Sequence, residues 1–238
     1  PPTGPTYPAA VPLLCAPPPG DPDRRPESAA GAAGIALLAA GPWLLASALG
    51  GALGPDQGSP QADGLAPFAA RAEPGLGTLG SLAGLGGIWN AEAVPGSRAT
   101  LFAVAGTVAL LAVVACGLPA VARRPAAVPL LALAGVAVLG PAAMATGPGL
   151  AVLRAVVEAV PGLAVLRDGQ KWVGLAMPGY TLAGAAAVLT FRRGNPRTAR
   201  EIAPKREWAP AAVCCAALIA ALPDLAWGVW GRVTPVHY

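Results

Sequence analysis

Hydrophobic positions along this chain come in long blocks that are separated by short polar segments. A helix that crosses a bilayer needs ~20 consecutive, mainly apolar residues. The blocks of that length cover residues 28–50, 99–118, 126–146, 172–191 and 209–230. The first four contain no Asp, Glu, Lys or Arg. The pattern therefore predicts an all-α, polytopic integral membrane bundle with about five transmembrane helices.

Basic residues lie beside these blocks on alternate connections. Ten Lys and Arg residues lie in three segments: before the first block, between the second and third, and between the fourth and fifth. These three segments share one side of the membrane, and the segments on the other side hold six. Cytoplasmic loops carry an excess of Lys and Arg. The bias predicts a multi-pass cell-membrane protein with its basic loops in the cytoplasm. Loops 51–98 and 147–171 are then extracytoplasmic.

Both outward loops carry apolar sequence. Residues 75–90 are apolar but too rich in glycine and too short to span, which predicts a re-entrant or interfacial segment. Residues 149–160 predict a short interfacial helix with Arg154 and Glu158 on one face, where they could pair. Residues 1–27 are rich in proline and predict a linker or loop remnant, and 231–238 predict the start of another outward segment. We expect the chain to be a piece of a longer protein.

Composition and charge narrow the classes of function. The chain is 55% hydrophobic and 12% charged, whereas soluble domains have about 25% charged residues. Its net charge of +4 comes from clusters beside apolar blocks, which argues against nucleic-acid binding. The single histidine, His237, excludes a multi-histidine metal site within this sequence, and the cysteines lack metal-ligand spacing. No metal site is predicted, and the cofactor is left unassigned.

The most informative polar feature is a charged island at residues 166–172, Leu-Arg-Asp-Gly-Gln-Lys-Trp, between two nearly uncharged stretches. Ionisable groups near the hydrocarbon are costly and tend to mark sites for substrates or ions. Arg167 can grip two phosphate oxygens, and Lys171 adds a compact cation. Gln170 can bond a sugar hydroxyl, and Asp168 can hold Arg167 in place or bind a sugar. The island predicts a phosphate and sugar site.

A structural interpretation stands beside this one. Lys and Arg commonly flank membrane helices as anchors, and Trp172 and Trp89 suit the interfacial belt. Arg167 and Asp168 could form a simple surface ion pair. Asn90, after Trp89, could line a sugar site or only end the glycine-rich segment.

The order of these motifs resembles a known family. An outward glycine-rich segment ends in Gly86-Gly87-Ile88-Trp89-Asn90, two helices follow, and an Arg-x-x-x-Lys-aromatic stretch opens the next helix at Arg167, Lys171 and Trp172. This order resembles the actinobacterial polytopic membrane glycosyltransferases of the GT-C type, especially the arabinofuranosyltransferase-like proteins of cell-wall assembly. The resemblance covers about residues 63–191.

The resemblance implies an enzyme that moves a sugar from a polyprenyl-phosphate lipid to an extracytoplasmic glycan acceptor during cell-wall biogenesis. The family's catalytic carboxylate usually lies in the first outward loop, near the N-terminus, so none is carried over and the catalytic residue is unassigned. Candidate bases in the outward loops are Asp56, Asp63, Glu73, Glu92, Glu158 and Asp168.

Two other classes of function remain open. A transporter or lipid flippase places polar groups in broken helices at mid-membrane. Pro42, Pro141 and Pro178 could break helices here, but the middle segments of the blocks carry no charge, and the sequence shows no internal repeat. A non-catalytic membrane scaffold needs only close helix packing, which small residues allow.

Overall fold

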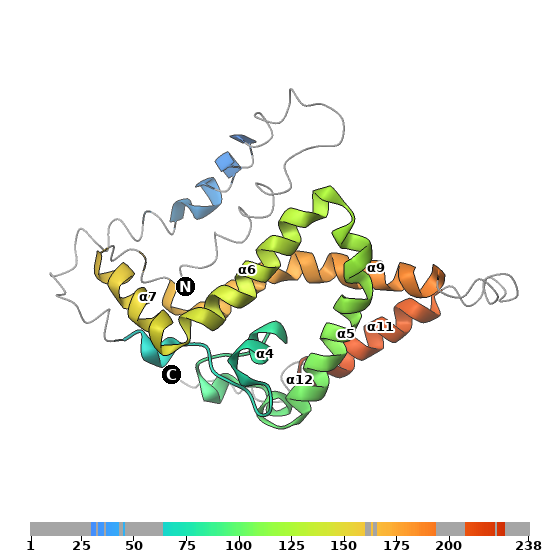
Figure 1. Cartoon of the computed structure of the whole chain (residues 1–238), viewed down its shortest axis with the longest axis horizontal. Coiled ribbons are helices and arrows are strands. Elements are labelled where there is room, and N and C mark those ends of the chain that lie inside the picture. Colours follow the sequence, from blue (N-terminus) through green and yellow to red (C-terminus); the bar gives the residue numbers. More distant parts are fainter. Residues whose placement is uncertain are drawn as a thin grey trace, which may run out of the picture. The chain divides into compact units, whose positions relative to one another are not determined.

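The chain is mainly helical in the part that the structure describes (Figure 1). This computed structural model describes residues 30–31, 33–35, 37–42, 45, 64–159, 163, 166–193, 208–221 and 223–226. No strand occurs within these ranges, and the only β-type pairing there is an isolated bridge between Glu73 and Gly77. The all-α prediction is therefore confirmed for the described residues.

Among the described residues, three helical stretches are long and apolar enough to cross a membrane. They are Phe102–Ala122, Pro125–Met144 and Gly169–Thr190. Each begins and ends within four residues of a predicted block. Only about 30% of each stretch is buried inside the protein. Apolar side chains such as Val108 and Val136 instead stand exposed, as expected of helices that face lipid.

The first and fifth predicted spans stay predictions. Of the first, 28–50, the structure describes residues 30–31, 33–35, 37–42 and 45, all of them helical, whereas the predicted segments 1–27 and 231–238 lie outside the described residues. In the region of the fifth, the structure has α11 (Ala209–Ala221) and then α12 (Pro223–Ala226). The 13 residues of α11 are fewer than the ~20 of a full span.

The described chain divides into two compact units. The first combines Pro1–Ala69 with Pro125–Pro178, and the second combines Ala70–Arg124 with Gly179–Tyr238. Besides the helical residues described between 30 and 45, the first unit contains η2 (Ala66–Phe68), η5 (Pro125–Ala127), α6 (Val128–Met144), α7 (Gly147–Ala159), α8 (Gly169–Trp172) and η7 (Val173–Ala176).

In the first unit, α6 is the helix on which the others pack. It contacts α7, α8 and η7. The small apolar core joins Leu65, from the segment before η2, to Leu153 and Val157 of α7. Met144 and Leu166 pack against this core. Because Leu65 is distant in sequence from α7, the core fixes the position of η2 on this unit.

A tight turn joins α6 to α7. The hydroxyl of Thr146 donates to the carbonyl of Ala143 at 2.7 Å and accepts the amide of Gly149 at 3.1 Å. This cap starts α7 at Gly147, two residues before the predicted helix. Arg154 and Glu158 share its exposed face, as predicted, but within the described residues no ion pair joins them.

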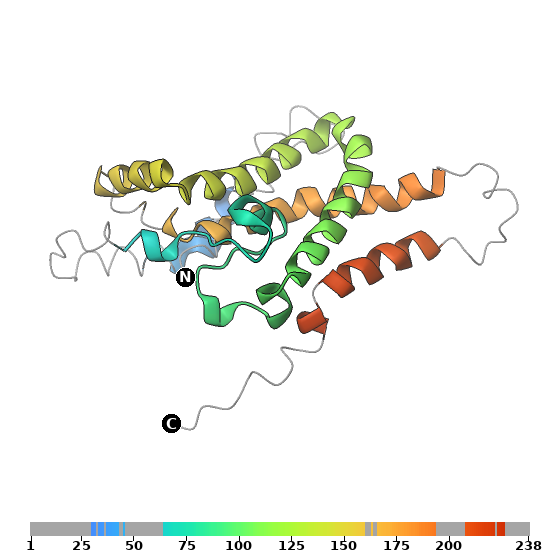
Figure 2. The same cartoon turned by 60° about the horizontal axis from the view of Figure 1, so that its bottom comes forward.

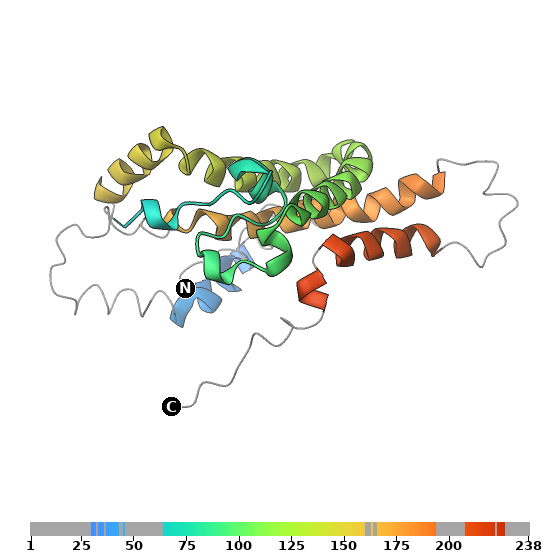
Figure 3. The ribbon, with the colours of Figure 1, turned by 90° about the horizontal axis from the view of Figure 1, so that it is seen from below.

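The second unit is built on α5 (Phe102–Ala122), with α11 packed along it and α12 near its beginning (Figure 2). Its other helices are α4 (Gly77–Ala83), η3 (Ala91–Ala93), η4 (Gly96–Ala99) and the part of α9 (Met177–Arg193) from Gly179 onward. α4 packs on α5, and α12 lies beside η4, which leads into α5 (Figure 3).

Glycines on α5 let backbones approach closely. A Cβ on Gly117 would overlap the carbonyl oxygen of Ala183 in α9. A Cβ on Gly106 would stand 2.8 Å from the carbonyl oxygen of Ala221 in α11. Small residues at helix crossings are a common means of packing in membranes, where no hydrophobic driving force brings helices together.

Candidate functional site

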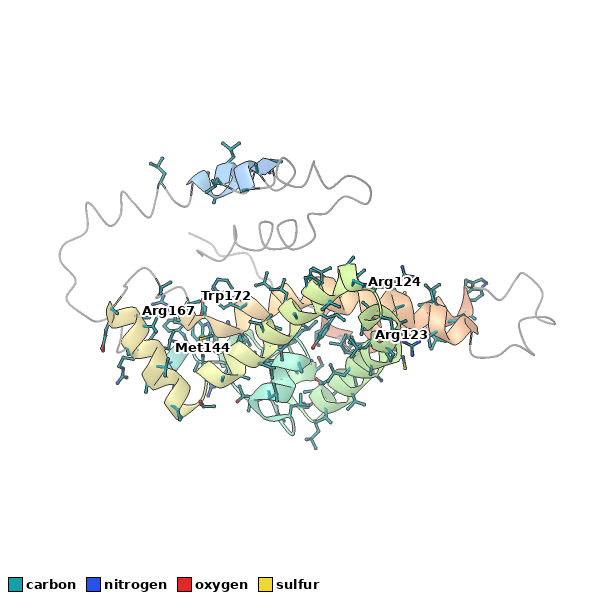
Figure 4. The ribbon with its side chains drawn as sticks, turned by 45° about the horizontal axis from the view of Figure 1, so that its top comes forward. Arg123, Arg124, Met144, Arg167 and Trp172 are labelled. Carbon is teal, nitrogen blue, oxygen red and sulfur yellow. The ribbon has the colours of Figure 1, made fainter. Side chains whose placement is uncertain are left out.

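The island, residues 166–172, lies where the chain enters its third long apolar stretch. Asp168 directly precedes α8 and has φ −83° and ψ 58°, so the helix begins inside the island. Gly169 is buried, and a Cβ there would stand 3.2 Å from Cβ of Pro141. The island thereby packs on the C-terminal part of α6. Figure 4 shows Arg167 and Trp172 at the same end of α6 as Met144.

The two cations of the island have different partners. Lys171 Nζ donates to Asp168 Oδ2 in an ion pair whose side chains are 34% and 16% exposed. The guanidinium carbon of Arg167 lies 4.5 Å from the centre of the Phe68 ring, which belongs to η2. A cation over an aromatic face gains about 0.5–2 kcal/mol, depending on its exposure to water. The structure thus pairs Asp168 with Lys171 and not with Arg167.

Three polar atoms of the island are buried without a partner. Asp168 Oδ1, Gln170 Oε1 and Trp172 Nε1 make no hydrogen bond, as judged over the part of the chain that the structure describes. An unpaired buried polar atom costs about 1–3 kcal/mol. Two of these atoms accept hydrogen bonds and the indole donates one. Their clustering within five residues, next to two cations, is the arrangement expected of a site whose ligand supplies the missing partners.

The other predicted site residues, Trp89 and Asn90, belong to the second unit. The side chain of Asn90 accepts the amide of Glu92 at 3.0 Å and so caps η3. The carbonyl of Trp89 accepts Nη1 of Arg71 at 3.3 Å. The first interaction is a local helix cap, and the second ties the end of the glycine-rich segment to Arg71, which precedes it.

The second unit contains a buried ion pair between Glu73 and Arg98. Arg98 is 4% exposed and Glu73 8%. Arg98 Nε donates to Glu73 Oε1 at 3.0 Å, and Arg98 Nη2 donates to Oε2. The amide of Gly87 adds a bond of 3.3 Å to Oε1. Two parallel bonds from one guanidinium to one carboxylate form the strongest geometry available to such a pair.

The surrounding backbone is fitted closely to this pair. A Cβ on Gly86 would overlap both Glu73 Oε1 and Arg98 Nη2. The hydroxyl of Ser81, which is fully buried, accepts the amide of Glu73 at 2.8 Å and donates to Gly77 O at 2.7 Å. The glycines that suggested a re-entrant segment therefore allow the backbone to lie on a buried ion pair.

A further polar contact holds the helix that carries Arg98. The amide of Ser97 in η4 donates to Asp224 Oδ2 of α12 at 2.8 Å. Two separate polar contacts thus tie η4 to distant residues, through Arg98 to Glu73 and through Ser97 to Asp224. The Glu73 carboxylate is engaged by three donors and does not stand open to a substrate, which removes Glu73 from the candidate bases.

Comparison with known protein families, with curated proteins and with solved structures gives no match to this chain.

Proposed function

We propose that this chain is part of a membrane glycosyltransferase that takes its sugar from a polyprenyl-phosphate donor, and that the island holds the donor's head group. The observation that carries the proposal is the set of unpaired atoms at Asp168, Gln170 and Trp172 beside two cations. Sugar hydroxyls donate to the two acceptors, and a phosphate or sugar oxygen accepts from the indole. Arg167 and Lys171 balance the phosphate charge.

The place of the island suits a lipid-linked ligand. It stands at the beginning of a long apolar stretch, Gly169–Thr190, and packs on α6 near Pro141. A head group bound there can leave its polyprenyl chain in the hydrocarbon beside exposed apolar side chains. The basic pair Arg123-Arg124 comes directly before Pro125, where the α6 stretch starts (Figure 4). With that end cytoplasmic, the island faces the extracytoplasmic side, where we propose that the glycan acceptor is glycosylated.

The transfer itself is a substitution at the sugar's anomeric carbon. The bond from that carbon to the phosphate oxygen breaks, the polyprenyl phosphate leaves with the electron pair, and an acceptor hydroxyl forms the new glycosidic bond. The hydroxyl proton passes to a base, for which a positioned carboxylate is the usual group. In this chain, we assign the island to binding the donor, and the base is left unassigned.

Titration with farnesyl-phosphate-linked arabinose, followed by native mass spectrometry, tests the proposal. Purified wild type is compared with an Arg167→Ala/Lys171→Ala variant. Each lost charge-assisted contact should cost about 1.5–3 kcal/mol, so binding should weaken at least about tenfold. An Arg123→Ala/Arg124→Ala variant is the matched control, since it loses the same charge at the other end of α6.

The control should bind as wild type does. Equal losses in both variants would mean that the lipid responds to net charge and not to a site. If wild type did not bind the lipid, or if the island variant bound it equally well, the proposal would be wrong and Arg167 and Lys171 would be helix anchors.

A further inference from the structure

The ion pair inside the island leaves half of a carboxylate unused. Asp168 Oδ2 receives Lys171, whereas Oδ1 is buried with no partner among the described residues. Lys171 is the more exposed member, at 34%. An incoming anion can therefore reach the lysine, but it must approach a carboxylate to do so. A bare phosphate would be repelled by Asp168, since like charges within a few ångströms interact unfavourably.

A glycosyl phosphate avoids this repulsion because it brings hydroxyl groups. We propose that Asp168 is a selectivity residue that distinguishes the glycosylated lipid from the spent lipid phosphate. In the bound state the phosphate takes Lys171, and sugar hydroxyls donate to Asp168 and Gln170. This inference rests on the proposed function and assigns how the same site tells donor from product.

The lipid becomes more negative when it loses its sugar, which strengthens its repulsion by Asp168. The donor is a phosphodiester with one negative charge. After transfer, the polyprenyl phosphate is a monoester that carries about −1.5 to −2 at pH 7. It has also lost the hydroxyls that satisfied Asp168. The spent lipid is then repelled by the carboxylate, and the Asp168–Lys171 pair forms again. Asp168 thereby favours release of the product.

The alternative is that the pair only anchors the start of α8. An anchoring pair would hold Lys171 in place and affect every anionic lipid alike. The two roles differ in the ratio of affinities for two ligands, and not in the affinity for one.

Native mass spectrometry of wild type and Asp168→Asn, with farnesyl-phosphate-linked arabinose and with farnesyl phosphate, measures this ratio. Wild type should bind the glycosylated lipid more tightly. The variant should bind farnesyl phosphate about tenfold more tightly than wild type does, while its affinity for the glycosylated lipid falls or is unchanged. Glu201→Gln, which removes one carboxylate from the link that the sequence predicts to be cytoplasmic, should leave both affinities unchanged.

A second measurement needs no variant. Farnesyl methyl phosphate has one charge and no sugar, and wild type should bind it more tightly than farnesyl phosphate. A site that only attracts negative charge would prefer the more highly charged monoester, farnesyl phosphate. Tighter binding of farnesyl phosphate than of farnesyl methyl phosphate would therefore overturn the inference.

The outcomes separate the inference from the proposed function. If wild type binds the glycosylated lipid but Asp168→Asn weakens both ligands by the same factor, Asp168 is an anchor and the glycosyltransferase proposal stands. If wild type binds neither ligand, both proposals fail.

Discussion

Replacing Arg98 with methionine should strongly destabilise the second unit. Methionine has a side chain of similar length to arginine, but the substitution removes two of the three donors to the Glu73 carboxylate. The remaining donor is the Gly87 amide at 3.3 Å. With both side chains more than nine-tenths buried, the carboxylate would be left in a poorly solvated site. Breaking a buried pair in this way costs about 3–5 kcal/mol.

Removing both charges should restore much of that loss. A Glu73→Leu/Arg98→Met variant leaves no buried charge, and such replacements are often neutral or even stabilising. The assay is thermal or SDS-induced unfolding of the full chain in detergent, monitored by circular dichroism. Wild type, both single variants and the double variant form a double-mutant cycle.

The reasoning would be refuted by a coupling energy near zero, with the double variant losing the sum of the single losses. It would equally be refuted if Arg98→Met cost less than about 1 kcal/mol, which is the range of an exposed ion pair. Either result would mean that water reaches the pair, contrary to its burial.

Two glycine substitutions test the close backbone contacts. Gly86→Ala should lower stability by about 1–3 kcal/mol, because its Cβ would overlap Glu73 Oε1, and thermal unfolding in detergent measures the loss. Gly117→Ala should cost a similar amount or more, since its Cβ would overlap the backbone carbonyl of Ala183, and cysteine cross-linking between α5 and α9 would report their separation. The control for both is Gly135→Ala in α6, where a Cβ meets nothing within 4 Å. If Gly86→Ala and Gly117→Ala changed the stability no more than Gly135→Ala does, the packing argument would be contradicted.

The apolar stretches were predictable because length and hydrophobicity act locally. Blocks 99–118, 126–146 and 172–191 appear as helices within a turn of their predicted ends, since about 20 uncharged apolar residues in sequence leave few alternatives. The fifth block was harder to predict because Pro223 interrupts it, and proline lacks the amide hydrogen that a continuing helix uses.

The polar contacts were less predictable because their partners are distant in sequence. Nothing local shows that Arg98 pairs with Glu73, or that Arg167 lies over Phe68. The available signal for the first pair was an isolated charge on each side of a glycine-rich apolar segment. The pairing of Asp168 with Lys171 could have been predicted, since residues three apart face each other at a helix start. Arg167 was chosen instead because it is the nearer cation in sequence.

The Glu73–Arg98 pair has a consequence for how the protein is made. Every hydrogen-bond partner that the described residues supply to these two side chains lies between residues 73 and 98, in the segment that precedes α5. Chains are synthesised at about 5–20 residues per second, so Arg98 emerges about 1–5 s after Glu73, which lies 25 residues earlier. The arginine can therefore meet its counter-charge before any later span has emerged. Because Arg98 is buried against its carboxylate, it can stand beside α5 on the side predicted to be extracytoplasmic without leaving an unpaired charge next to the apolar stretch.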